Sequence, residues 1–447
     1  MATYEELCKR MYKDIISLEK TRQEEEVCLI ASENYTYKDV MEAQGSCLTN
    51  KYAEGYPDHR YYGGCEYVDM AEKMAIDNCK NLFKCKYANV QPHSGSQANQ
   101  AVYAALLNPG DTVLAMDLNS GAHITHVSKA SYTSKIYKPV YYGLDKNGYI
   151  NYDEIKEKLN KYHPKLLIVG ASAYSREIDF QRIRNILDEY NKNKPTCVLE
   201  EHTDVESRET TTWKRIIEPC YFMVDMAHIA GLVAAGEHMS PVPYADVITS
   251  TSQKTLRGPR GGFIITNDEE IAKKVDRAVF PQTQGGPLMH VILGKAIAFD
   301  RASLPSFKRY IRRVKNNIKA MEDVFERWGL GMVSGGTDNH LILIDLTKIN
   351  ASVSGKDVEE SLSRVGIIVN KNAVPNDKRP KSETSGIRIG TAAITTRGFT
   401  EEECEELAKI IYFHCFGDVS DKEIIEQTKR VREMCKAHPI ETAKDLQ

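Results

Sequence analysis

The stretch "YFMVDMA" (221–227) is a short apolar run that carries one carboxylate, Asp225, near its end. Three other runs share this apolar character: "DTVLAMD" (111–117), "KLLIVGASAY" (165–174) and "DVITST" (246–251). Each has the composition of a buried strand, and helix-like stretches lie between several of them. Strands that alternate with helices over ~200 residues predict an α/β fold with a mostly parallel sheet.

The rest of the chain predicts two further parts. Residues 4–26 predict an exposed amphipathic helix, and "PSFKRYIRRVKNNIKAMEDVFERWG" (305–329) predicts a long helix that ends at a glycine. The runs "HLILIDL" and "IIVNKN" then predict strands of a second, smaller α+β domain. We therefore expect an N-terminal arm over residues 1–67, a large domain over 68–300 and a small C-terminal domain over 301–447.

Residues 191–219 interrupt the alternation of strands and helices. The segment is polar and rich in threonine and glutamate, and it separates a predicted helix from the strand that carries Asp225. Connections in α/β units usually have about 2 to 6 residues. We therefore predict an insertion that forms a solvated excursion on the surface. Strain passed from it into the next strand would disturb Asp225.

Composition argues against several classes of function. The 447 residues are 42% apolar and 27% charged, as in ordinary globular proteins. A formal net charge of -3 gives no electrostatic case for nucleic acid or an anionic membrane, and no apolar run approaches the ~20 residues that span a bilayer. The 11 cysteines form no CxxC pair, so neither a zinc site nor a disulfide framework is indicated. We expect reduced thiols, no bound metal and a cytoplasmic location.

A helix start near residue 94 offers groups that can bind an anion. In "QPHSGSQANQAVYAALLNPG" (91–110), Ser94, Gly95 and Ser96 precede a helical stretch. Free N–H groups and hydroxyls at such a start suit a phosphate, although the same residue types are also ordinary helix caps. The spacing matches neither a P-loop nor GxGxxG, so a nucleotide is not indicated.

Asp225 and Lys254 complete a pattern that is typical of one cofactor. Asp225 stands at the end of a parallel strand, where α/β folds bind ligands, although it could equally cap a helix. Lys254 precedes the glycine-rich "LRGPRGG", in which Arg257 and Arg260 are expected to activate its amine. Pyridoxal 5′-phosphate (PLP) requires an anion cradle, a carboxylate for its ring nitrogen and an amine for its aldehyde. The combination therefore predicts a PLP site.

Eight blocks of sequence recur in the same order in one enzyme family. They are "LIASENYT", "LTNKYAEGYPDHRYYGG", "QPHSGSQAN", "DMAHIAGLVAAG", "KTLRGPRGG", "QGGPLMH", "GTDNHL" and "SGIRIGTAAITTRG". On these motifs the sequence resembles the serine hydroxymethyltransferases over nearly its whole length. The resemblance implies an aspartate aminotransferase-like fold of fold-type I, in which the large domain has a mostly parallel seven-stranded sheet and the C-terminal domain is a smaller α+β unit.

The resemblance, carried over motif by motif, implies a role for each site residue. The implied catalytic residues are Lys254, Glu54, Asp225, His123, Tyr52 and Thr251. The implied cofactor-binding residues are Ser94, Gly95, Ser96, His123, Ser172, Asp225, His228, Lys254 and Gly286. The implied substrate-binding residues are Ser32, Tyr62, Arg388 and Gln253. The implied folate-binding residues are Leu118, Ala122, Ile124, Tyr61 and Asn372.

Within this set, Lys254 would bind PLP covalently, and Arg388 would bind the substrate carboxylate through its guanidinium. The implied reaction is the reversible transfer of the serine hydroxymethyl group to tetrahydrofolate, with glycine and 5,10-methylenetetrahydrofolate as products. Glu54 would transfer protons around the hydroxymethyl group.

The resemblance also implies that the active site is shared between two copies of the chain. Tyr52, Glu54, Tyr61 and Tyr62 would cross the subunit interface, and Gly286 would reach the phosphate of the neighbouring subunit. The expected partners are thus serine, glycine, tetrahydrofolate and a second copy in an obligate homodimer, or a tetramer built from it.

Two positions depart from the family pattern. Gln253 stands where the family has a histidine before the lysine, and Ala122 stands where it has a glycine. Glutamine cannot titrate, so we expect altered substrate discrimination or rate, and the Ala122 methyl group would lie near the pterin. Two alternatives stay open at this point: a catalytically impaired PLP-binding paralogue that serves as a partner subunit, and a folate-independent β-hydroxy amino acid aldolase.

Overall fold

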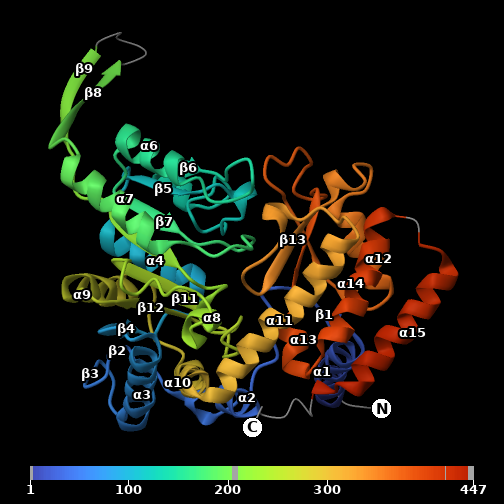
Figure 1. The fold of residues 1–447 in the computed structure, drawn as a ribbon. Coiled ribbons are helices and arrows are strands. Elements are labelled where there is room, and N and C mark those ends of the chain that lie inside the picture. The colour runs from blue at the N-terminus through green and yellow to red at the C-terminus, as the bar shows by residue number, and fades with distance from the viewer. Residues whose placement is uncertain (1–3, 204–209, 418, 441–447) are drawn as a thin grey trace.

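The structure is a computed structural model, and it describes residues 4–203, 210–417 and 419–440. A seven-stranded sheet of order β4-β12-β11-β10-β7-β5-β6 forms its centre (Figure 1). In that order the strands are β4 (Tyr87–Asn89), β12 (Gly262–Thr266), β11 (Val247–Thr251), β10 (Tyr221–Asp225), β7 (Leu166–Val169), β5 (Thr112–Met116) and β6 (Lys138–Tyr142). The strands from β11 to β6 pair in parallel, whereas β12 runs antiparallel to β11 and β4. The predicted mostly parallel α/β sheet is confirmed.

The strand that ends in Asp225 lies inside this sheet. β10 pairs with β7 on one side and with β11 on the other. Its residues Phe222, Met223 and Val224 are completely buried. Phe222 and Val224 enter one core cluster and Met223 enters another, because successive side chains of a strand point to opposite faces. Both faces of the sheet are therefore covered, as expected for a parallel sheet.

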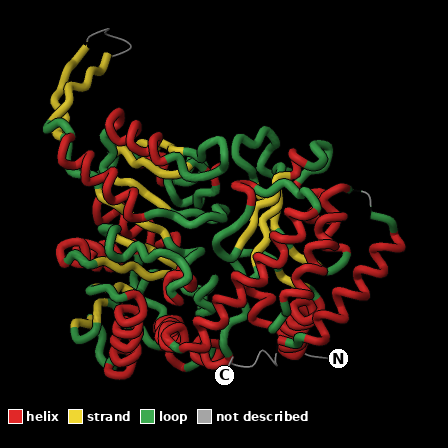
Figure 2. Tube along the Cα trace, in the orientation of Figure 1, coloured by secondary structure: helices red, strands yellow, loops and turns green. Residues whose placement is uncertain are grey.

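Helices provide this cover (Figure 2). The helices associated with the central sheet are α3 (Glu66–Phe83), α4 (Gly95–Leu106), α5 (Thr133–Ile136), α6 (Tyr152–Tyr162), α7 (Phe180–Asn193), α8 (Ala230–Ala235), α9 (Glu269–Arg277) and α10 (Met289–Ser303). α4 packs against β11 and β12, and α10 packs against α3. The contacts of α4 with β11 and β12 place the start of α4 beside the ends of the central strands.

The N-terminal segment contacts both the C-terminal region and the helices around the central sheet. Its elements are α1 (Tyr4–Glu25), β1 (Val27–Cys28), α2 (Lys38–Gln44), β2 (Gly55–Tyr56) and β3 (His59–Arg60). β1 pairs in parallel with β14 of the C-terminal region, whereas α2 packs against α10. Within the described residues, no helix is both long and apolar enough to cross a membrane.

The C-terminal region has its own core. Its elements are α11 (Pro305–Arg327), β13 (Leu341–Asp345), α12 (Gly355–Arg364), β14 (Ile367–Ile368), β15 (Asn370–Asn372), β16 (Gly386–Gly390), α13 (Ala392–Arg397), α14 (Glu401–Phe416) and α15 (Asp421–Ala437). β13, β16 and β15 form an antiparallel sheet. α11 joins the two parts, because Phe307 and Tyr310 belong to the first core cluster and Met321 and Phe325 to the C-terminal one. The expected domain limits stay a prediction.

Most of the insertion predicted at residues 191–219 forms an antiparallel ribbon of two strands, whereas residues 191–193 belong to the end of α7. β8 (Cys197–Thr203) and β9 (Thr210–Ile216) pair with each other and extend away from the central sheet (Figure 1). The segment is thus a surface excursion, as predicted, but it has regular strands that its polar composition did not indicate. Residues 204–209, which join the strands, lie outside the described part of the chain. The ribbon leaves the pairing of β10 intact up to Asp225.

Replacing Cys197–Ile216 with a short glycine linker tests whether the ribbon is independent of the core. The Ile217 N–H donates to the carbonyl oxygen of Thr196 at 2.9 Å, so the ribbon leaves and rejoins the body at one point. We expect the thermal midpoint to change by less than about 3 °C and PLP binding to persist, because the core strands keep their partners. Loss of PLP binding would show that the ribbon supports β10.

Candidate functional site

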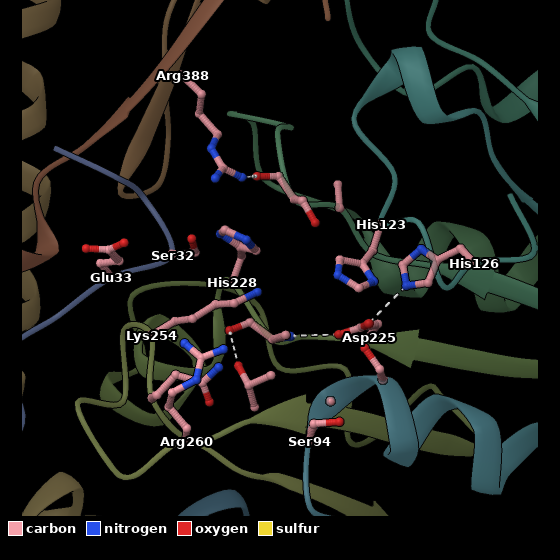
Figure 3. A pocket seen from close by; sticks show the side chains of 17 residues that line it. Ser32, Glu33, Ser94, His123, His126, Asp225, His228, Lys254, Arg260 and Arg388 are labelled. Carbon is pink, nitrogen blue, oxygen red and sulfur yellow. Dashed lines mark hydrogen bonds and ion pairs between the residues drawn. The ribbon is translucent and has the colours of Figure 1, made fainter. Parts of the chain in front are cut away.

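A cavity of about 370 Å³ lies where β7, β10 and β11 end (Figure 3). It brings together many of the residues that were predicted from the sequence: Ser32, Ser94, Gly95, Ser96, His123, Ser172, Asp225, His228, Thr251, Gln253, Lys254 and Arg388. The lining also includes Glu33, His126, Ala171, Ala227 and Arg260. The carboxyl ends of parallel strands are the usual ligand site of α/β sheets.

The start of α4 forms the anion-binding side of this cavity. Ser94 caps the helix, and its Oγ accepts a hydrogen bond from the Gln97 N–H at 3.2 Å. A Cβ added to Gly95 would lie 2.6 Å from Cγ2 of Thr251 at the end of β11, so a side chain there would collide with the Thr251 side chain. The first N–H groups of a helix have no acceptor within the helix and carry the positive end of its dipole. They can therefore bind the phosphate of a ligand.

Asp225 presents a buried carboxylate to the cavity. Its Oδ2 lies 2.9 Å from Nε2 of His126 and 2.9 Å from Nδ2 of Asn99, and its Oδ1 accepts from the Ala227 N–H at 3.0 Å. Burial alone would raise the pKa of Asp225, but the hydrogen bonds and charge of His126, with the contributions of His123 and Asn99, hold it well below its ordinary value. The group is thus an anion throughout the neutral range.

His126 and Asn99 contact Asp225 at the site but were not predicted from the sequence. His126 follows His123 by three residues in "GAHITH", and Asn99 lies in the first turns of α4. The Asn99 amide is itself fixed, because its Oδ1 accepts from the Thr249 hydroxyl at 2.6 Å. The polar residues of α4 are visible in the sequence. The sequence does not show that one of them contacts the Asp225 carboxylate.

Lys254 is buried beside this carboxylate. Desolvation lowers the pKa of its amine to about 8; the charge of Asp225 acts against this shift, and the charges of Arg388 and Arg260 add to it. Arg260 lines the cavity, as the sequence led us to expect. Arg257 instead stacks on the ring of Tyr37 at 4.1 Å, so the cationic field comes from Arg260 and Arg388.

Arg388 closes the other side of the cavity, and Figure 3 shows it and Ser94 on opposite sides of Lys254. Its Nη1 donates to the carbonyl oxygen of Ser172 at 2.6 Å, and its Nε and Nη2 donate to Oδ1 of Asn370 at 3.1 and 3.0 Å. Burial lowers the pKa of Arg388 to about 10, which still leaves the guanidinium charged at neutral pH. These contacts fix a cation where it can bind a carboxylate.

Two neutral imidazoles line the space between these charged groups. Burial lowers the pKa of His123 to about 4, and Nδ1 of its ring lies 2.7 Å from Oγ1 of Thr125. Burial also lowers the pKa of His228, and its ring stacks on that of His340 with 5.5 Å between centroids. An aromatic ligand can therefore contact uncharged rings in this part of the cavity.

Gln253 lies at the edge of the cavity, where its Oε1 accepts from the Gly261 N–H at 3.3 Å.

The residues expected to cross a subunit interface lie outside this cavity and gather in a second, more exposed group. The rings of Tyr52 and Tyr62 are 5.1 Å apart, and Tyr61 contacts Phe280 with 5.6 Å between ring centroids. A Cβ on Gly286 would lie 3.0 Å from the Tyr52 ring, and one on Gly285 would lie 3.3 Å from Oε1 of Glu54. Tyr52, Glu54, Tyr61, Tyr62 and Gly286 are therefore near one another on the surface of the described chain.

The residues expected to bind folate differ in their exposure. Leu118 and Asn372 are half-buried, Ala122 is buried and Ile124 is exposed. They are not among the residues that line the cavity. The Asn372 amide donates to the carbonyl oxygen of Ala373 at 2.8 Å. The folate site stays a prediction.

We expect Lys254 to react as an amine with a pKa near 8 in the protein without PLP. At pH 7 about a tenth of such an amine is neutral, against less than about 0.1% for an ordinary lysine. Mass spectrometry after brief labelling with an amine-selective reagent at several pH values would give the midpoint for Lys254 and for the exposed Lys38 in the same sample. Asp225→Asn is expected to lower the Lys254 midpoint further. Equal midpoints for both lysines would contradict the account.

Comparisons with known proteins agree with this geometry. The family model described as "Serine hydroxymethyltransferase" matches residues 6–193 and 210–411, and the unmatched residues 194–209 include β8. A serine hydroxymethyltransferase of Dichelobacter nodosus (strain VCS1703A) is 52% identical over 427 residues, which are 95% of each chain. That of Francisella tularensis subsp. novicida (strain U112) is 50% identical over 428 residues, which are 96% of this chain and 95% of the relative. The chain therefore belongs to the serine hydroxymethyltransferase family.

Proposed function

We propose that the chain interconverts serine and glycine, with tetrahydrofolate as the acceptor of the hydroxymethyl group and 5,10-methylenetetrahydrofolate as the second product. Membership of a PLP-dependent family supports this activity. The observation that carries the proposal is the convergence of Lys254, Asp225, the start of α4 and Arg388 on one cavity. A cytoplasmic location stays a prediction from the sequence.

The donor set fits PLP. The first N–H groups of α4, with Ser94 and Ser96, would bind its phosphate, and the ionised Asp225 carboxylate would accept from its ring nitrogen. Lys254 offers an amine of lowered pKa for its aldehyde. When bound, PLP supplies an electron sink for cleavage of the bond between Cα and Cβ of serine. A buried anion at Asp225 would keep the proton on the ring nitrogen.

The remaining residues would orient the substrates. Arg388 would bind the carboxylate of serine or glycine, with Ser32 beside it. His123 would lie against the ring, and Ser172 and His228 would contact its phenolic oxygen. Gln253 cannot become cationic, so this side chain would add no protonation step where the family pattern has a histidine.

A second copy of the chain would complete the site. Glu54 would accept and return the proton of the hydroxymethyl group, and Tyr52 and Tyr62 would close the cavity beside it. The exposure of Tyr52, Tyr61 and Tyr62, at 55%, 76% and 46%, supports an interface at this surface. A homodimer is therefore the smallest active unit in this proposal, and a single protomer would be inactive.

The activity is tested directly with purified protein loaded with PLP. Radiolabelled serine should yield glycine and methylenetetrahydrofolate when tetrahydrofolate is present, and Lys254→Arg should abolish the reaction while the protein remains folded. Cleavage of allo-threonine without any response to folate would point to an aldolase. Failure to take up PLP would favour a partner subunit without catalysis.

A mixture of two inactive variants tests the shared site. Lys254→Ala removes the amine and Glu54→Gln removes the carboxylate, so each homodimer should be inactive. In a mixed dimer one of the two sites would regain both groups, and a random one-to-one mixture should recover about one quarter of wild-type activity. Assays after unfolding and refolding the variants together would measure this recovery. No activity in a mixture that contains mixed dimers would show that both groups act within one chain.

A further inference from the structure

A buried lysine beneath the start of α4 has no part in the chemistry described above. Lys295, on α10, is 1% exposed. Its Nζ donates to the carbonyl oxygens of Val90, Pro92 and Gly262 at 2.6, 3.0 and 2.8 Å. Lysine is rarely buried to this extent unless its charge is compensated. The site therefore calls for a physical explanation.

The three acceptors indicate the protonated form of Lys295. An ammonium group has three N–H donors, whereas a neutral amine has two and would turn its lone pair toward one carbonyl oxygen. Burial lowers the pKa of Lys295 to about 7, and the charge of Glu72 acts in the opposite direction. Three carbonyl dipoles directed at Nζ further stabilise the ammonium ion.

The carbonyl groups that bind Lys295 belong to the two backbone segments that shape the start of α4. Val90 and Pro92 lie on the segment that leads from β4 to Ser94, and Gly262 begins β12. The two segments also contact each other directly, because the Gly262 N–H donates to the carbonyl oxygen of Pro92 at 3.0 Å. A Cβ on Gly262 would lie 3.0 Å from the Gly95 nitrogen. The Lys295 ammonium thus joins both segments next to the helix start.

We propose that Lys295 is a positioning residue for the phosphate site: its ammonium group bridges the 90–94 segment and β12, so that the N–H groups and hydroxyls at the start of α4 face the phosphate of PLP. Its positive charge also lies behind that site, where it favours a bound anion. The inference rests on the proposed PLP site, but it concerns the phosphate alone.

Lys295→Met tests the proposal, because methionine keeps the apolar stem and removes the three donors. Equilibrium titrations of the apoprotein would compare PLP with pyridoxal, which lacks the phosphate. We expect about a tenfold or greater loss of affinity for PLP and less than a twofold change for pyridoxal. Inorganic phosphate should also stabilise the wild-type apoprotein against heat more than it stabilises the variant. If Lys295→Met does not fold, Lys295→Gln, which keeps an amide donor, provides the same comparison.

A matched control removes a buried donor that does not reach the phosphate site. Asn317 is 2% exposed, and its amide donates to Oγ1 of Thr395 and to the carbonyl oxygen of Phe399. Asn317→Leu should change stability without any preference between PLP and pyridoxal. Equal losses for the two ligands in Lys295→Met, or an unchanged affinity for PLP, would overturn the positioning role. Failure of the wild-type protein to bind PLP would instead contradict the proposed function.

Discussion

The site depends on one buried anion, the carboxylate of Asp225. Burial of a carboxylate costs free energy unless hydrogen bonds and positive charge replace the water that it loses. His126, Asn99 and the Ala227 N–H supply these contacts, and they keep the group ionised. Without them, burial would favour the protonated form, which could not hold a proton on a ligand nitrogen.

The order of the strands determines which groups surround this anion. β10 ends at Asp225 between β7, which leads to Ser172, and β11, which leads to Lys254. α4 packs against β11 and β12, so Asn99 reaches the carboxylate and the helix start faces the same cavity. Lys254 and Asp225 are therefore brought together by the pairing of neighbouring strands.

The sequence predicted the elements that have a strong local pattern. The apolar runs that became β5, β7, β10 and β11 were recognisable, as was the long helix α11. The sequence did not predict the strands of the β8–β9 ribbon, because its composition is polar and its pairing is formed between its own two halves. The pattern of apolar residues therefore predicts elements that are buried in the core. It predicts much less well the exposed strands that pair only with each other.

Part of the candidate site could be predicted because several of its residues lie at the ends of elements with a recognisable apolar pattern. Lys254 follows β11, Asp225 ends β10 and Ser94 caps α4, and each of these elements was recognisable in the sequence. The roles of His126 and Asn99 depend on which face of a helix or loop meets the end of β10, and that information lies in the packing. Arg257 and Arg260 are three positions apart in the sequence, yet one stacks on Tyr37 and the other lines the cavity.

The protonation state of the ring nitrogen of bound PLP tests the central claim most directly. The ¹⁵N chemical shift of ring-labelled PLP would be recorded in the wild-type protein across the pH range in which it stays folded. The account predicts a protonated nitrogen throughout this range, and loss of the proton in Asp225→Asn. A wild-type nitrogen that loses its proton near neutral pH would contradict the role assigned to Asp225.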